Sequence, residues 1–61
     1  MAVDVIAVNM DTMLTRLIAV DKSEKNAEAI VSMAVMRRGV DVEFFTTVPH
    51  GAYSDGMTYE N

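Results

Sequence analysis

The sequence contains no cysteine and a single histidine, His50. Without cysteine the chain cannot form a disulfide and lacks the ligands of most structural zinc sites, and one histidine removes the remaining common patterns. We therefore expect neither a metal nor another cofactor. A chain of 61 residues is small enough to need a cross-link or a partner for stability. Oligomerisation is the source of stability that remains.

Basic residues are also few, with five Lys and Arg against nine Asp and Glu and a net charge of -4. Binding to nucleic acid relies on clustered Lys and Arg that contact phosphates. The one adjacent basic pair is Arg37 and Arg38. We therefore expect no direct nucleic-acid partner.

Long apolar runs are missing as well. A transmembrane helix needs ~20 consecutive apolar residues, and charged residues interrupt every apolar stretch here. No basic residue precedes the first apolar run, and Asp4 interrupts it, so the pattern of a secretory signal is absent. We expect no membrane partner and a cytoplasmic location. With 51% apolar and 23% charged residues, the chain has the composition of a folded domain.

The first third of the sequence predicts a β-hairpin. Residues 2–8 and 12–20 are rich in the β-branched residues that favour strands, and the polar residues 9–11 separate them. A loop of these polar residues would join the two strands. The resulting register pairs Val8 with Thr12, Ile6 with Leu14 and Asp4 with Arg16.

A helix and a third strand follow the hairpin. Asp21 and Glu24 are spaced as in a capping box, and Gly39 is typical of a helix C-terminus, so we expect a helix over residues 22–38. Residues 40–48 then alternate between apolar and polar or charged side chains, which predicts a half-buried strand.

The expected architecture is a small α+β fold with the order β-β-α-β. Residues 1–49 would form a single domain with a three-stranded mixed sheet in the order 2-1-3, the third strand antiparallel to the first and the helix on one face. Residues 50–61 contain two glycines and few aliphatic side chains. They are expected to form an irregular C-terminal arm or tail.

Both faces of the expected hairpin are apolar, although one helix can cover only one of them. One face would hold Val3, Val5, Ala7, Met13, Leu17 and Ala19, and the other would hold Ile6, Val8, Leu14, Ile18 and Val20 together with Asp4 and Arg16. An exposed apolar patch of this extent is typical of an interface. We expect a homo-oligomer, with a symmetric dimer as the first expectation. The alternative is that the tail folds back over the second face.

The leading functional hypothesis is a small acidic interaction protein without catalytic residues. The alternation of residues 40–48 would expose Phe45 beside Asp41 and Glu43, a suitable anchor for a protein partner with a basic face. Tyr53 and Tyr59 of the tail would add contacts. Such a chain would regulate or inhibit a larger protein. Accessory proteins of phages and mobile elements are often of this kind.

The alternative hypothesis is an oligomeric protein that binds a small anionic or nucleotide-like ligand at subunit junctions. Arg37 and Arg38 would hold the anion, and Tyr53 or Tyr59 of the tail would close over it, with His50 as a further residue of the site. An enzyme would need His50 as its acid or base. Ser54 and Asp55 follow His50 closely, but a flexible stretch is a poor support for a hydrolytic triad.

Overall fold

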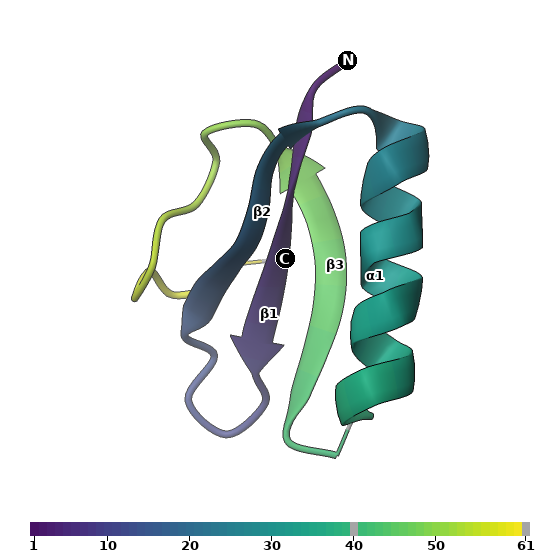
Figure 1. The fold of residues 1–61 in the computed structure, drawn as a ribbon. Helices are drawn as coiled ribbons and strands as arrows, with labels where there is room; N and C mark the ends of the chain where they lie inside the picture. The colour runs from purple at the N-terminus through teal and green to yellow at the C-terminus, as the bar shows by residue number, and fades with distance from the viewer. Residues whose placement is uncertain (40, 61) are drawn as a thin grey trace.

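The computed structural model describes residues 1–39 and 41–60, so Val40, the expected start of the third strand, lies outside the described residues. Its elements are β1 (Val3–Asn9), β2 (Thr15–Lys22), α1 (Glu24–Arg38) and β3 (Glu43–Pro49). Figure 1 shows the three strands side by side, with α1 lying along the sheet. The predicted order of two strands, a helix and a third strand is therefore confirmed.

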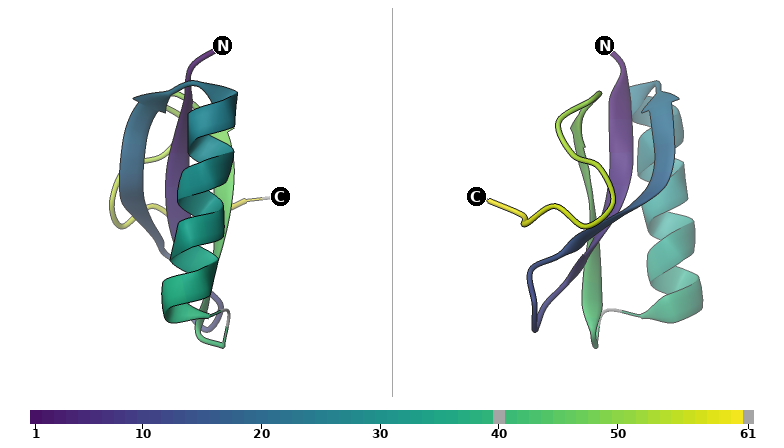
Figure 2. Two further views of the ribbon diagram at one scale, coloured as in Figure 1. Left: turned by 45° about the vertical axis from the view of Figure 1, so that its right-hand side comes forward. Right: turned by 90° about the vertical axis from the view of Figure 1, so that its left-hand side faces the viewer.

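The sheet has the predicted order, β2-β1-β3. Both neighbouring pairs are antiparallel. The central strand β1 is also the most apolar, and its residues from Val5 to Val8 are fully buried. The helix covers one face of the sheet, and the chain after β3 crosses the opposite face (Figure 2).

Next to the turn, the hairpin register differs from the prediction by three residues, and irregularities on both sides of Val5 shift it further along the strands. Val8 lies opposite Thr15 and Ile6 opposite Leu17, so the expected loop of residues 9–11 was too short. The reason is local: the Oδ1 atom of Asn9 accepts hydrogen bonds from the backbone N–H groups of the second and third residues after it, at 2.9 and 3.1 Å. These bonds support a wider turn that ends at Met13, where φ is 61°.

An odd shift of register turns every side chain of a strand to the other face. Leu17 therefore packs with Ile6 rather than with Val5. The expected pair of Asp4 with Arg16 was wrong for the same reason, because Arg16 lies opposite Ala7. Asp4 instead binds His50, and Arg16 binds Glu43.

The helix begins two residues later than predicted. Ser23, not Asp21, is the N-cap, and its side chain accepts a hydrogen bond from the backbone N–H of Asn26 at 3.2 Å. The predicted end is confirmed. Gly39 has a φ of 72°, and its N–H donates to the carbonyl of Val35 at 2.8 Å.

Phe45 lies on the face of the sheet that α1 covers. It pairs with Ala7 across β1 and β3 and is only 8% exposed. The prediction of an exposed Phe45 was wrong, because the alternation of β3 places one phenylalanine on each face and the sequence does not show which face is covered. Ala27 is the fully buried residue of α1.

Residues of the C-terminal tail pack against the opposite face. The cluster there consists of Ile6, Val8 and Val48, and Tyr53 and Tyr59 of the tail pack against it together with Met13, Leu17 and Phe44. The second apolar face is therefore covered within the chain, as the alternative hypothesis for the tail proposed. Burial of this face no longer requires a second subunit.

Candidate anion-binding groove

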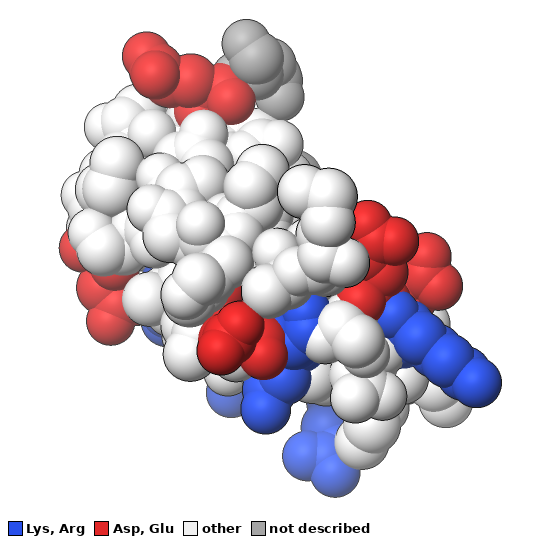
Figure 3. Space-filling view, turned by 90° about the horizontal axis from the view of Figure 1, so that it is seen from above, with Lys and Arg blue, Asp and Glu red and all other residues white. Residues whose placement is uncertain are grey.

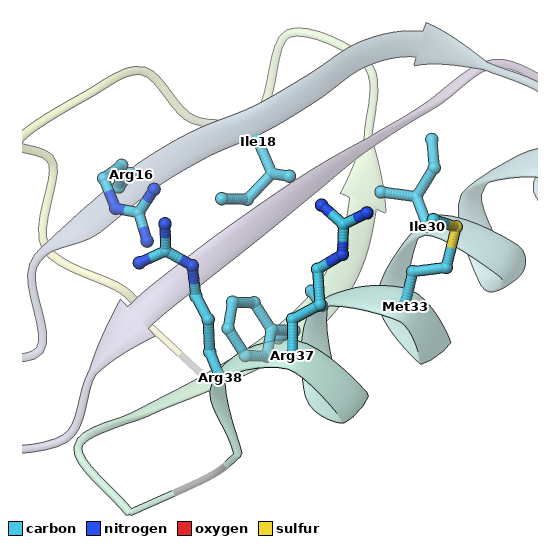
Figure 4. A pocket seen from close by; sticks show the side chains of 8 residues that line it. Arg16, Ile18, Ile30, Met33, Arg37 and Arg38 are labelled. Carbon is cyan, nitrogen blue, oxygen red and sulfur yellow. The ribbon is translucent and has the colours of Figure 1, made fainter.

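A groove of about 390 Å³ lies between α1 and the β2 side of the sheet. We refer to it as the arginine groove (Figure 4). Its volume is in the range of small-molecule sites. The lining residues are Arg16, Ile18, Ile30, Met33, Ala34, Arg37, Arg38 and Phe45.

The local structure explains why these side chains converge. Arg16 and Ile18 are two residues apart on β2 and therefore share one face of the strand. Ile30, Ala34 and Arg37 are three or four residues apart on α1 and share one side of the helix. The helix side and the strand face are both mainly apolar near the sheet, so the groove has an apolar floor and arginines around it.

The three arginines differ in their contacts. The Nη2 atom of Arg16 donates to Oε1 of Glu43 at 2.8 Å, in a pair that is partly exposed. Within residues 1–39 and 41–60, neither Arg37 nor Arg38 has a carboxylate partner. Figure 4 shows the guanidinium group of Arg38 directed toward that of Arg16, and that of Arg37 directed from the helix toward the sheet.

This clustering is unusual for a chain with net charge -4. All five basic residues lie between Arg16 and Arg38 in the sequence, and three of them line the groove. The view from above shows the basic side chains on the helix side of the molecule with acidic side chains beside them, while the surface on the tail side is mostly uncharged (Figure 3). The groove is therefore a local positive site on an acidic protein.

Two electrostatic effects act on this cluster. Arg37 and Arg38 lie in the last turn of α1, where positive charge interacts favourably with the helix dipole. That interaction does not account for Arg16, which reaches the same place from β2. In the described part of the chain, three guanidinium groups face only two nearby carboxylates, those of Glu43 and Asp41. An anion among the arginines would offset the remaining positive charge. The arrangement is suited to a phosphate or carboxylate group.

A second polar site surrounds the buried carboxylate of Asp4, which is 2% exposed. Its Oδ1 accepts from Nδ1 of His50 at 2.8 Å and from the N–H of Asp21 at 2.8 Å, while Oδ2 accepts from the N–H of Gly51 at 3.0 Å. The pKa of Asp4 is lowered to about 2. The hydrogen bond from His50 has the largest effect, and those from the N–H groups of Gly51 and Asp21 come next. The same bond to Asp4 raises the pKa of His50 above its ordinary value.

This site does not form a hydrolytic triad. The carboxylate of Asp55 accepts from the N–H of Leu17 at 2.7 Å instead of orienting His50. The partner of His50 is Asp4, which was not predicted from the sequence. An acidic residue inside an apolar strand was a signal of a buried, satisfied carboxylate. Among the described residues, no group of three or more His, Asp or Glu side chains is placed to hold a metal ion.

The structure separates the residues of the alternative ligand hypothesis. Arg37 and Arg38 line the groove on the helix side, whereas Tyr53 packs on the tail side of the sheet and His50 binds Asp4. Within one chain these four residues do not form one site. Arg16, which was predicted to pair with Asp4, is the arginine of the groove that was not predicted as a ligand-binding residue.

The residues proposed to contact a protein partner are also dispersed. Asp41 and Glu43 border a hollow next to the arginine groove, together with Arg16 and Arg38. They are therefore close to basic groups and do not form a separate acidic surface. Phe45 is buried beneath the helix, and the tail tyrosines pack on the other face.

No protein-family model matches the sequence, and neither a curated protein nor a solved structure matches the chain. In the part of the chain that the structure describes, no helix combines the length and apolar character needed to span a membrane.

Proposed function

We propose that this chain is a binding protein whose arginine groove holds an anionic ligand with an apolar or aromatic part. The observation that carries the proposal is the convergence of Arg16, Arg37 and Arg38 around an apolar floor in a chain of net charge -4. A small anionic ligand was also the alternative hypothesis from the sequence. The site proposed here differs, because it contains Arg16 and does not contain His50 or Tyr53.

The chemistry of the groove favours a phosphate ester over a free inorganic anion. Guanidinium groups bind phosphate and carboxylate through paired N–H donors. The apolar floor formed by Ile18, Ile30 and Phe45 would bury the organic part of such an ester, and burial of apolar area adds to affinity. An aryl phosphate combines both groups in a molecule small enough for the groove.

Thermal unfolding with phenyl phosphate, inorganic phosphate and benzyl alcohol tests this proposal. Ligand at about ten times its Kd stabilises the folded state by about 1.4 kcal/mol. For a domain of this size that stabilisation corresponds to a rise in Tm of roughly 6–11 °C. Phenyl phosphate should raise the Tm most, inorganic phosphate less, and the uncharged alcohol least.

Substitutions distinguish a site from general attraction of anions. Arg16→Gln, Arg37→Gln and Arg38→Gln should each weaken the response to phenyl phosphate. Lys25→Gln, which removes the same charge from an exposed position on α1 outside the groove, should leave the response unchanged. A response that is absent at high ligand concentration, or that Lys25→Gln reduces as much as Arg38→Gln does, contradicts the proposal.

A second candidate function is the interaction protein that regulates or inhibits a larger partner. The observation that favours it is the exposed apolar surface near the C-terminal end of α1, where Met33 is 53%, Met36 85% and Val42 59% exposed. Exposed methionines suit adaptable protein contacts. Because Arg37 and Arg38 adjoin this surface, it fits an acidic partner better than the basic one expected from Asp41 and Glu43.

Native mass spectrometry of the protein purified from the cells that make it tests the second candidate. A protein companion should be retained by the wild type and lost in Met36→Asp. Met57→Asp is the matched control, since Met57 is an exposed methionine of the tail, at 44%. A companion that both variants retain excludes the α1 surface as its binding site.

A further inference from the structure

The tail lies along the outer edge of β2 in the manner of a short additional strand. The N–H of Thr15 donates to the carbonyl of Met57, and the carbonyl of Thr15 accepts from the N–H of Gly56, both at 2.8 Å. The N–H of Tyr59 donates to the carbonyl of Met13 at 2.8 Å. Leu14 and Thr58 form an antiparallel bridge. The tail thus satisfies backbone groups of a strand edge that would otherwise be free to pair.

Side chains add specificity to this backbone pairing. The Thr15 hydroxyl donates to the carbonyl of Ser54 at 3.0 Å. The ring of Tyr59 packs edge-on against that of Phe44, with 5.6 Å between the ring centroids, and its centroid lies 5.5 Å from that of Tyr53. Backbone pairing at an edge combined with side chains packed on the adjoining face is the usual mode in which a sheet binds an extended peptide.

One turn connects this segment to the rest of the molecule. The N–H of Ala52 donates to the carbonyl of Pro49 at 3.0 Å, and Gly51 has a φ of 83°, which reverses the chain after β3. The bonds from His50 and Gly51 to Asp4 fasten the turn to β1. A change of conformation confined to this turn would move the tail without breaking the pairing of β1 with β2 and β3.

We infer that the β2 edge and the adjoining apolar face form a binding site for an extended segment, and that residues 52–60 of a second copy of the chain fill it by reciprocal exchange. The exchanged pair would be a symmetric dimer in which every contact of the tail is formed between subunits. The proposed function does not enter this inference, because the arginine groove lies on the other face of the sheet.

Several observations favour a second copy as the occupant. The β2 edge already binds this tail sequence through backbone hydrogen bonds, through the packing of the two tyrosines and through the bond from the N–H of Leu17 to the carboxylate of Asp55. An identical tail therefore needs no new complementarity. Exchange of an identical element is a low-cost route to a dimer, and a chain of 61 residues gains stability from a partner.

Disulfide trapping tests the exchange without interference, because the sequence contains no cysteine. Opposed residues of an antiparallel pair are close enough for a disulfide, so Leu14→Cys and Thr58→Cys place thiols on facing positions. The two single variants are mixed in equal amounts, incubated at low and high protein concentration, oxidised and examined by intact mass spectrometry. The double variant, oxidised at low concentration, reports the closed chain.

We expect the mixture to gain a heterodimer linked between the two variants, in an amount that rises with protein concentration. A mixture of Leu14→Cys with Lys25→Cys, whose exposed thiol lies on α1, should give far less. Asp4→Asn, introduced into both partners, should accelerate the exchange because it weakens the attachment of the turn. The inference is overturned if the double variant forms its internal disulfide while the concentrated mixture of single variants forms no heterodimer. Equal trapping by the Lys25→Cys control overturns it as well.

Discussion

The Oδ1 atom of Asp4 lies 2.8 Å from Nδ1 of His50, which joins the central strand to the turn that follows the last strand. The two ends of this contact differ sharply in exposure, because the side chain of His50 is 52% exposed and that of Asp4 only 2%. A buried carboxylate is stable only when hydrogen bonds replace its hydration. Asp4 therefore positions the turn, and through the turn it positions the tail.

Asp4→Asn should destabilise the protein by about 2–4 kcal/mol, the usual cost of breaking a buried charged hydrogen-bond network. The asparagine keeps the shape of the side chain but cannot accept from all three donors, and its NH2 group opposes one of them. Urea unfolding measures the change. Asp11→Asn, in the exposed hairpin loop, is the control and should change stability by less than about 0.5 kcal/mol. An Asp4→Asn variant as stable as the wild type contradicts the role assigned to Asp4.

Stability should depend on pH through both members of this pair. The folded pKa of Asp4 is lowered to about 2, so its contribution is present above the unfolded pKa and is lost as the pH falls through the folded value. The folded pKa of His50 is raised, so its contribution is present below the unfolded pKa and is lost as the pH rises through the folded value.

Urea unfolding across the pH range separates the two contributions. Between acid and neutral pH, Asp4→Asn should show a smaller gain of stability than the wild type. His50→Ala should remove the fall of stability that the wild type shows as its histidine loses the proton. A wild type and a His50→Ala variant with parallel profiles on the alkaline side would contradict the stabilising bond from His50.

The sequence predicted the order of elements because its signals were local. Gly39 marked the helix end, the β-branched segments marked the first two strands, and the alternation of residues 40–48 marked the third. The hairpin register failed because it depends on the side chain of Asn9, whose two hydrogen bonds to backbone N–H groups widen the turn. Asparagine is equally compatible with a shorter loop, so the residue type alone does not determine the register.

The groove could be predicted only in part for a related reason. Arg37 and Arg38 are adjacent in sequence and were recognised as a possible anion site. Arg16 joins them because the register places it opposite Ala7, on the face that α1 covers. The predicted register assigned Arg16 to the face of Asp4, so the correct convergence could not follow. A site built from distant segments is predicted correctly only when the pairing of the strands is predicted correctly.

Tyr59→Ala should loosen the tail more than the rest of the protein. Tyr59 packs against Phe44 and Tyr53, and loss of a partly buried ring of this kind costs roughly 1.5–3 kcal/mol. Hydrogen exchange of individual amides is the informative measurement. The N–H groups of Thr15 and Leu17, which donate to the tail, should exchange faster than those of β1.

The control for this prediction is Met57→Ala, which shortens an exposed side chain of the same segment. It should leave the Thr15 and Leu17 amides protected. Equal acceleration of all amides in Tyr59→Ala would show that the tail unfolds only together with the whole domain. Unchanged exchange at Thr15 would contradict the packing of the tail on the β2 edge.

Phe45→Ala should cost about 3–5 kcal/mol, the range for loss of a buried aromatic side chain. A domain of 61 residues has a total stability of roughly 3–9 kcal/mol at the usual values per residue, so this single change removes much of it. The exposed position first expected for Phe45 would have predicted almost no effect. Unfolding by urea, followed by circular dichroism, distinguishes the two expectations.

Val42→Ala is the matched control, because Val42 lies near the start of β3 and is 59% exposed. It should change stability by less than about 0.5 kcal/mol. Phe45→Leu keeps an apolar side chain between α1 and β3 and should retain most of the stability that Phe45→Ala loses. If Phe45→Ala were as stable as Val42→Ala, the helix could not be packed on Phe45, and the floor of the arginine groove would be wrongly placed.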